Sequence, residues 1–229
     1  MVFFLNTDIK LHLNYFDSLL KYFDKPSTFG VTGRIINPDK KSTPANGNPF
    51  FKEELKSEEK STKLISPSNS TSFISGSNAL LSRDKLEQLN GFDEIYSPFY
   101  FEDTDLCTRA KRLGWDCYED HDALCEHLGS ETVKSNFIKK NVKKVYFRNR
   151  MIYNAIHLEN RPGYFQKARI LFLDVIPKLL LGKTWIVSSY REFLEMHFKI
   201  YRSRLRFKKL MEIESIQATS QKTDCTSFG

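Results

Sequence analysis

The chain opens with an apolar run, residues 1–5, that turns polar at once at Asn6, Thr7 and Asp8. A run that is apolar on both faces is typical of a parallel strand buried between layers of helices. Chain ends normally lie at the surface, so a buried opening strand suggests that this sequence is the C-terminal part of a longer protein. An apolar strand at a sheet edge is the alternative interpretation.

Strand-like and helix-like patterns alternate after this run. Three segments have the composition of strands: residues 29–36, 71–81 and 123–127. Helical periodicity or capping residues mark three segments between them: residues 11–23, 83–89 and 102–113. The alternation indicates an α/β fold, in which the polar residues 40–70 form a long loop.

Charge is distributed unevenly along the chain. Residues 134–210 contain 19 Lys and Arg against 4 Asp and Glu, a net charge of +15. The remaining residues contain 16 against 24, a net charge of −8. We therefore expect a neutral-to-acidic body with a basic extension, and such an extension usually meets anionic lipid, phosphate groups or nucleic acid.

The basic extension has the composition of interfacial helices. Its helical segments, residues 137–157, 168–181 and 185–209, carry Lys and Arg among Leu, Ile, Phe and Trp. We expect contact with an anionic membrane surface, and a helical subdomain packed on the body is the alternative. Nucleic acid is not an expected partner, because the sequence carries no recognition motif for it. Residues from about 217 onward are polar and are predicted to be disordered.

Four cysteines form no CxxC pair, and no signal peptide or apolar stretch of membrane-spanning length is evident. Reduced thiols in the cytoplasm are the simplest interpretation, with a peripheral position at the inner face of the plasma membrane as a further expectation. Cys117, His121, Cys125 and His127 could form a zinc site, but their spacing matches no regular zinc motif.

Three carboxylates, Glu102, Asp103 and Asp105, stand where a helix is predicted to begin, directly after an aromatic stretch. They could simply cap free backbone N–H groups and complement the helix dipole. Alternatively, they lie at the mouth of a cleft, where the helix N-terminus keeps a carboxylate ionised and available as a general base.

Two further positions have both a structural and a functional interpretation. Gly76 interrupts a predicted strand, which marks either a bulge or the close approach of a ligand. His127 ends a predicted strand at a glycine-containing turn, and a lone histidine of this kind is usually structural or exposed rather than a ligand.

Taken together, five segments resemble, in order, the C-terminal half of the family 2 glycosyltransferases, including rhamnosyltransferase-like members. An apolar strand leads into Asn6-Thr7-Asp8, which is similar to a DxD motif. A glycine-containing strand, residues 75–83, ends in Arg83. Residues 90–94 resemble GGFDE, residues 101–106 resemble [FY]xEDxDL, and residues 127–130 resemble a histidine turn near the end of the catalytic domain.

The resemblance implies an incomplete GT-A (Rossmann-like) fold, a mixed sheet flanked by helices, with a helical C-terminal extension. The implied domains are the C-terminal part of the catalytic domain (1–133), the basic extension (134–211) and the disordered tail (212–229). Asp8 and His127 would hold a divalent cation, Mg²⁺ or Mn²⁺, that bridges the donor diphosphate. Asn6 departs from the usual first Asp of the motif, which leaves metal dependence open.

The resemblance also assigns the remaining candidate residues. Asp103 would be the general base, and Glu102 and Asp105 would orient the acceptor and the helix. Gly76 and Ser77 would line the sugar pocket, with Arg83 as a further substrate-binding residue.

The implied reaction is an inverting transfer of a sugar from a nucleotide-diphosphate sugar to the hydroxyl of a glycan or lipid-linked acceptor, in surface polysaccharide synthesis. In the family, the segment before the DxD strand binds the nucleotide base and ribose. This chain has no such residues, so we expect weak or no activity from it alone. The alternative is a non-catalytic remnant of the fold that acts as a binding or scaffold module.

Overall fold

The computed structural model describes residues 1–36, 70–71, 73–127, 139–157 and 163–226. For residues 127, 139–140 and 214–226 it describes the backbone alone. The chain forms two compact units. Unit 1 combines Met1–Gln88 with Gly114–Glu131, and unit 2 combines Leu89–Leu113 with Thr132–Gly229. This division differs from the predicted boundary at residue 133, because the helix that carries the acidic motif belongs to the unit of C-terminal helices.

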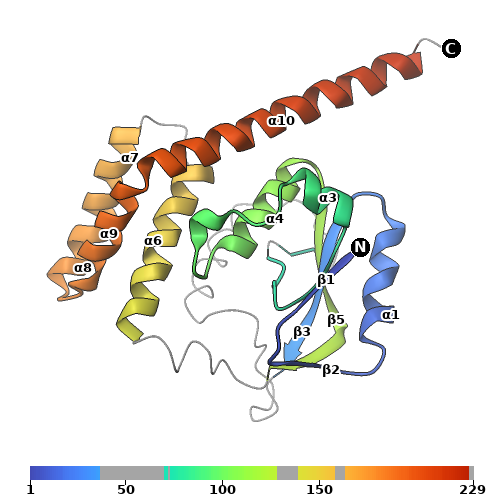
Figure 1. Cartoon of the computed structure of the whole chain (residues 1–229), viewed down its shortest axis with the longest axis horizontal. Coiled ribbons are helices and arrows are strands. Elements are labelled where there is room, and N and C mark those ends of the chain that lie inside the picture. The colour runs from blue at the N-terminus through green and yellow to red at the C-terminus, as the bar shows by residue number, and fades with distance from the viewer. Residues whose placement is uncertain (37–69, 72, 128–138, 158–162, 227–229) are drawn as a thin grey trace. The chain divides into compact units, whose positions relative to one another are not determined.

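Unit 1 contains a five-stranded mixed sheet, which confirms the α/β class (Figure 1). The strand order is β1 (Val2–Leu5), β4 (Asn78–Leu81), β3 (Thr28–Ile36), β5 (Asp116–His127) and β2 (Ile9–Leu11). Strands β3 and β5 are parallel, and the other pairs are antiparallel. The predicted position of residues 1–5 as a buried central strand is wrong, since β1 is half-buried at one edge of this sheet. Apolar residues on both faces do not by themselves distinguish an edge strand from a central one.

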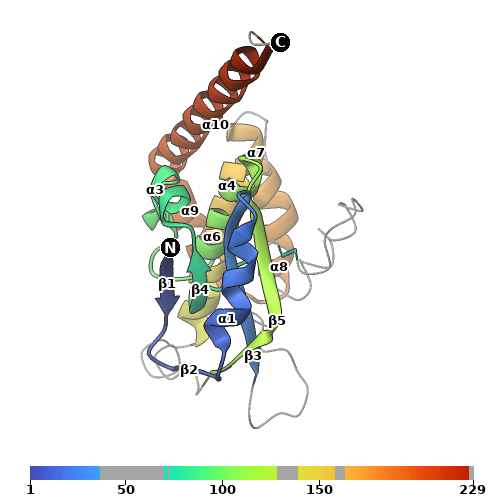
Figure 2. The same cartoon turned by 90° about the vertical axis from the view of Figure 1, so that its right-hand side faces the viewer.

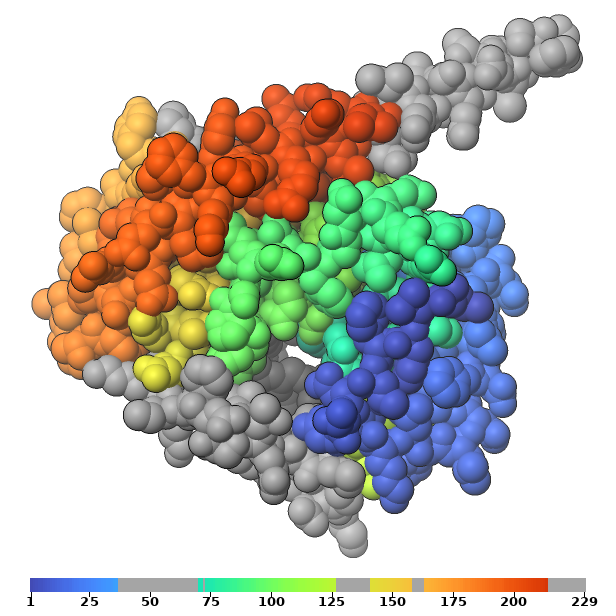
Figure 3. Space-filling model, in the orientation of Figure 1, coloured from blue at the N-terminus to red at the C-terminus, as the bar shows by residue number. Residues whose placement is uncertain are grey.

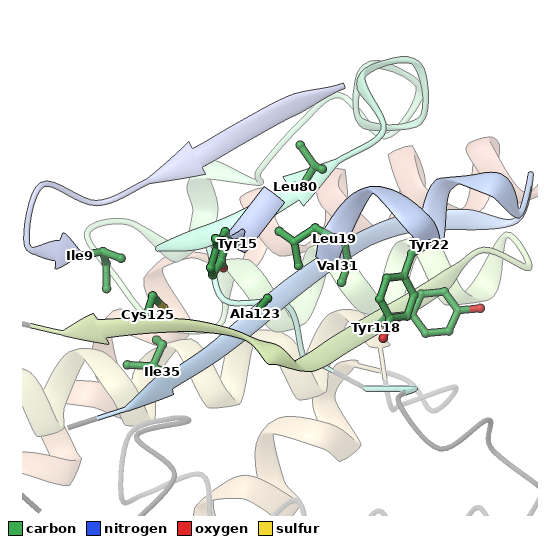
Figure 4. Packing of buried hydrophobic residues seen from close by; sticks show 10 residues of the cluster. All are labelled: Ile9, Tyr15, Leu19, Tyr22, Val31, Ile35, Leu80, Tyr118, Ala123 and Cys125. Atoms are coloured by element: carbon green, nitrogen blue, oxygen red, sulfur yellow. The ribbon is translucent and has the colours of Figure 1, made fainter. Parts of the chain in front are cut away.

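One face of the sheet is covered by helix α1 (Tyr15–Leu20), followed by the 3₁₀ turn η1 (Lys21–Asp24) (Figure 2). Tyr15, Leu19 and Tyr22 point from this layer into a cluster with strand residues such as Val31 and Cys125 (Figure 4). The helix predicted over residues 11–23 is therefore shorter than expected, since it begins at Tyr15, becomes a 3₁₀ turn at Lys21, and leaves Leu11 in strand β2. The segment Ile9–Leu11 pairs with β5 instead of joining the helix.

Strand β5 contains a bulge opposite β3. Gly33 pairs with Asp120, but the next residue, Arg34, pairs with Leu124, so residues 121–123 are extra. The buried Asp120 carboxylate stabilises the bulge by accepting hydrogen bonds from the backbone N–H groups of Asp122 (2.9 Å) and Ala123 (2.8 Å). A side chain at Gly33 would meet the Ala123 carbonyl oxygen at 2.4 Å, so only glycine allows this approach.

Unit 1 also contains the short helix α3 (Arg83–Gln88), which begins directly after β4. The strand predicted over residues 71–81 is shorter than expected. Residues 76–77 form a turn, and only Asn78–Leu81 enters the sheet.

Unit 2 is formed by helices. They are η2 (Glu94–Tyr96), α4 (Glu102–Arg112), α6 (Lys139–His157), α7 (Gly163–Ile170), the π-helix η3 (Leu171–Val175), α8 (Ile176–Leu180), α9 (Trp185–Glu195) and α10 (His197–Thr226). The helix predicted over residues 185–209 is broken at Met196, which separates α9 from α10. Helix α10 continues through residues that were predicted to be a disordered tail. In the part of the chain that is described, no helix is both long and apolar enough to cross a membrane.

Candidate functional site

The carboxyl ends of three co-directional strands meet at one edge of the unit 1 sheet. Strands β3 and β5 are parallel, and β1 runs in the same direction because both β1 and β3 are antiparallel to β4. They end at Leu5, Ile36 and His127. In open α/β sheets, ligands bind outside the carboxyl ends of such strands. We therefore take this edge as the candidate site.

Asn6, Thr7 and Asp8 form the turn at this edge. The Asn6 backbone N–H donates a hydrogen bond to the Ser77 carbonyl (2.9 Å), and the Ile9 N–H donates one to the Asn6 carbonyl (3.2 Å). Ile9 is paired with His127 across β2 and β5. The backbone thus brings Asp8, Ser77 and His127 together from three distant parts of the sequence.

A buried polar network fixes the strand that Ser77 precedes. Asn78 is fully buried, and its side-chain amide donates to the Gly33 carbonyl (2.8 Å) while its oxygen accepts from the Thr32 hydroxyl (2.8 Å). The Tyr15 hydroxyl donates to the Asn78 carbonyl (2.7 Å) and accepts from the Gly33 N–H (3.0 Å). Every member of this network is in a strand or helix, so the start of β4 is rigidly placed beside the turn.

Charged side chains that were not predicted stand next to the same edge. Glu126 accepts a hydrogen bond from His12 (2.9 Å) and pairs with Lys10 (3.6 Å). The hydrogen bond from His12 and the charge of Lys10 lower the pKa of Glu126. On β5, burial raises the pKa of the half-buried Glu119. No sequence pattern indicated Glu119, because the strand predicted there covered only residues 123–127, whereas β5 begins at Asp116.

Arg83 does not join the site. Ser77 comes just before Asn78, at the end of β4 that pairs with Leu5. Arg83 comes after Leu81, at the end of β4 that pairs with Val2. Arg83 and Ser77 are therefore at opposite ends of a four-residue strand, roughly 13 Å at about 3.3 Å per residue. The Arg83 side chain is exposed and pairs with Glu87 (2.7 Å) along its own helix.

The acidic motif lies in unit 2, at the start of α4. Asp105 is buried, and its carboxylate accepts hydrogen bonds from His157 (2.6 Å), Arg109 (2.8 Å) and the Tyr96 hydroxyl (3.1 Å). Arg109 also donates to the carbonyls of Leu89 and Gly91. Asp105 therefore holds α4 against α6 and the preceding turn.

The first turn of α4 follows an unusual backbone. Tyr100 and Phe101 both have left-handed conformations, with φ of 73° and 76°, which are costly for residues with a side chain. The buried side-chain amide of Asn149 holds this segment, at 2.9 Å from the carbonyl oxygens of both Phe99 and Tyr100. Such strain persists only when the surroundings enforce it, and it is frequent at functional sites.

At this strained start, the pKa of Glu102 is shifted in the direction opposite to the one expected. Glu102 is half-buried, and burial raises its pKa above the usual value, although the helix dipole was expected to favour the ionised form. Its Oε2 atom is buried with no hydrogen-bond partner among the described residues. Asp103 is half-buried in the same turn.

Few of the described side chains at either place could bind a cation. Among the described residues, no three His, Cys, Asp or Glu side chains gather into a metal-binding group. Cys117 and Cys125, which the zinc alternative used, are buried thiols of β5. At the sheet edge Asp8 offers one carboxylate. That donor set fits a hard cation that takes most of its ligands from substrate phosphates and water, as Mg²⁺ commonly does.

In comparisons with protein-family models and with curated proteins, the chain gives no match.

Proposed function

We propose that this protein is a glycosyltransferase of the GT-A type that transfers a sugar from a nucleotide-diphosphate sugar to an acceptor hydroxyl. One observation carries the proposal. The Asn6–Ser77 hydrogen bond and the Ile9–His127 pairing bring the DxD-like turn, the glycine-containing turn and the histidine to the carboxyl edge of one sheet. That is where an α/β protein binds a nucleotide diphosphate.

The residues have separate roles in this proposal. Asp8 and His127 would hold the divalent cation, and the cation would supply positive charge to neutralise the departing diphosphate. The turn at Gly76 and Ser77 lines the donor sugar. Asp103 accepts the proton of the acceptor hydroxyl, whose oxygen attacks the anomeric carbon as the bond to the diphosphate breaks. Attack from the side opposite the leaving group inverts that carbon.

Equilibrium binding of a nucleoside diphosphate with Mn²⁺, measured by calorimetry, tests the donor half of the proposal. We expect Asp8→Asn to weaken the cation-dependent binding about tenfold or more. Asp17→Asn is the matched control, since Asp17 is an exposed carboxylate of α1. Equal binding by both variants would remove Asp8 from the site.

The acceptor half is tested by the transfer reaction itself. Asp103→Asn should lower turnover about 10²–10⁴-fold, the usual contribution of a general base, and leave diphosphate binding unchanged. Turnover that Asp103→Asn leaves unchanged would remove Asp103 from the role of general base.

A further inference from the structure

Helix α10 has two opposite apolar sides, of which only one is buried. Ile200, Ser203 and Phe207 are spaced by three and four residues, so they share the inward side. Ser203 donates a hydrogen bond to Asp93, and the Phe207 ring lies 5.6 Å from that of His157. These contacts are all within unit 2 and fix the rotation of the helix about its axis.

The other side carries Phe198, Tyr201 and Leu205, which we call the outward stripe. Their spacing is the same, and at 100° per residue they lie about 160° around the helix from the buried side. They are 72%, 62% and 48% exposed, respectively. Core packing therefore does not explain them, and exposed apolar side chains gathered along one line mark an interaction surface. Figure 3 shows the atoms of this half of α10 in orange-red on the face in view.

Cations flank the outward stripe on both sides. Residues 197–209 contain six Lys and Arg and no Asp or Glu. Arg202 lies on one flank and Lys208 on the other, and both are exposed. Lys208 also pairs with Glu212 at 3.9 Å on the exposed surface. Long basic side chains can place their charges among anionic groups while their alkyl stems run along an apolar surface.

We propose that the outward stripe of α10 docks on an anionic lipid bilayer, with Phe198, Tyr201 and Leu205 entering the interface and the flanking cations meeting lipid phosphates. This charge complementarity, together with the aliphatic Leu205, favours lipid over nucleic acid, because an aliphatic side chain does not stack on bases. The proposal concerns unit 2 alone and does not depend on sugar transfer.

A second exposed apolar group lies elsewhere in unit 2, at Phe172, Leu173, Leu180 and Leu181. Its nearest cations along the chain are Lys178, which is paired with Asp174 at 3.0 Å, and the exposed Lys183. Because residues 169–183 contain three Lys and Arg and one Asp, against six Lys and Arg and no acid in residues 197–209, we assign the docking to α10. The group at residues 172–181 serves as an internal control.

Flotation of the purified full chain with phosphatidylcholine vesicles, with and without phosphatidylserine, tests the proposal. We expect binding only to the anionic vesicles. Arg202→Gln with Lys208→Gln should weaken it about 25-fold, from about fivefold for each basic residue near an anionic surface. Phe198→Ser with Tyr201→Ser and Leu205→Ser should weaken it at least about tenfold.

Matched variants separate the α10 surface from charge or apolar area in general. Lys111→Gln with Arg191→Gln removes two exposed cations from α4 and α9 and should change binding by less than about threefold. Leu180→Ser with Leu181→Ser should leave binding in place. Circular dichroism and thermal melting must show each variant folded, which surface substitutions normally allow.

Three outcomes would overturn the proposal. The first is equal affinity for neutral and anionic vesicles. The second is loss of binding confined to the variants at Leu180 and Leu181. The third is no vesicle binding by the folded chain, together with salt-sensitive binding of RNA or DNA that requires Arg202 and Lys208.

Discussion

At the scale of single residues, Asp105 and His157 show how charge is buried in unit 2. Burial works to raise the pKa of Asp105, but the hydrogen bond from His157 and the charge of Arg109 outweigh it and hold that pKa below its ordinary value. Burial lowers the pKa of His157 despite the neighbouring carboxylate. The His157 Nδ1 atom has no partner among the described residues, so a proton there would be a buried, unsatisfied donor. We infer a neutral His157 that donates from Nε2 to an ionised Asp105.

A pH dependence of stability follows from these two shifts. A histidine whose folded pKa is depressed stabilises the fold fully above its unfolded pKa, about 6.5, and progressively less as the pH falls below it. Asp105, with its lowered pKa, loses its contribution only at more acidic pH, below about 3.8. The melting temperature of the wild type should therefore fall as the pH is lowered from 6.5 to 5. The variant His157→Gln should show a smaller dependence of the melting temperature on pH in this range. An unchanged slope would mean that His157 is not buried as described.

Tyr15 is the corresponding residue in unit 1. Its hydroxyl satisfies one buried carbonyl and one buried N–H in the network around Asn78. Tyr15→Phe removes both hydrogen bonds and keeps the apolar contacts, so we expect a loss of about 1–3 kcal/mol in the free energy of unfolding. Urea denaturation measures it, with Phe16→Tyr on the exposed side of the same helix as a control that should change little.

At the scale of elements, the bulge in β5 depends on the glycine opposite it in β3. Asp120 folds residues 121–123 out of register, and Gly33 leaves room for the Ala123 carbonyl. Bulges redirect the strand that contains them. This one lies four residues before His127, so it sets where β5 delivers that residue at the candidate site.

Gly33→Ala should therefore disturb more than local packing. The new methyl group would meet both the Ala123 carbonyl and the Tyr15 ring, and overpacking of this kind costs about 1–3 kcal/mol. Denaturant unfolding measures the loss, and amide chemical shifts should change from residue 121 to 127. Wild-type stability with unperturbed shifts would show that β3 and β5 are not packed this closely.

The elements also show what the sequence can predict. The strand at residues 29–36, observed as Thr28–Ile36, and the start of α4 were predictable, because a short stretch rich in apolar residues and a cluster of first-turn acids are local signals. Strand β2 was not, since three residues, Ile9–Leu11, match a helical pattern as well as a strand. His157, a hydrogen-bond partner of Asp105, lies 52 residues further along the chain, and no local pattern indicates that the two residues are in contact. The resemblance likewise grouped Arg83 with Ser77 in one substrate site, although β4 separates them.

At the scale of the whole molecule, the two compact units divide the chemistry of the proposal. Unit 1 contains the turn with Asp8, Ser77 and the pairing to His127, and unit 2 contains Asp103 and the docking stripe of α10. The excess positive charge of residues 134–210 belongs to unit 2, whereas the candidate donor site belongs to unit 1. Donor binding and membrane docking should therefore respond to different substitutions.

The most direct test of the central claim is to locate a cation–diphosphate complex on the protein. Mn²⁺ with pyrophosphate, added to the isotope-labelled chain, broadens the NMR signals of amides near the bound ion. We predict that the broadening is strongest around Asn6–Ile9 and Ser77 and that it requires pyrophosphate. We also predict that it disappears in Asp8→Asn but not in Asp17→Asn. Broadening centred on Glu102–Asp105, or broadening that Asp8→Asn leaves unchanged, would contradict the claim.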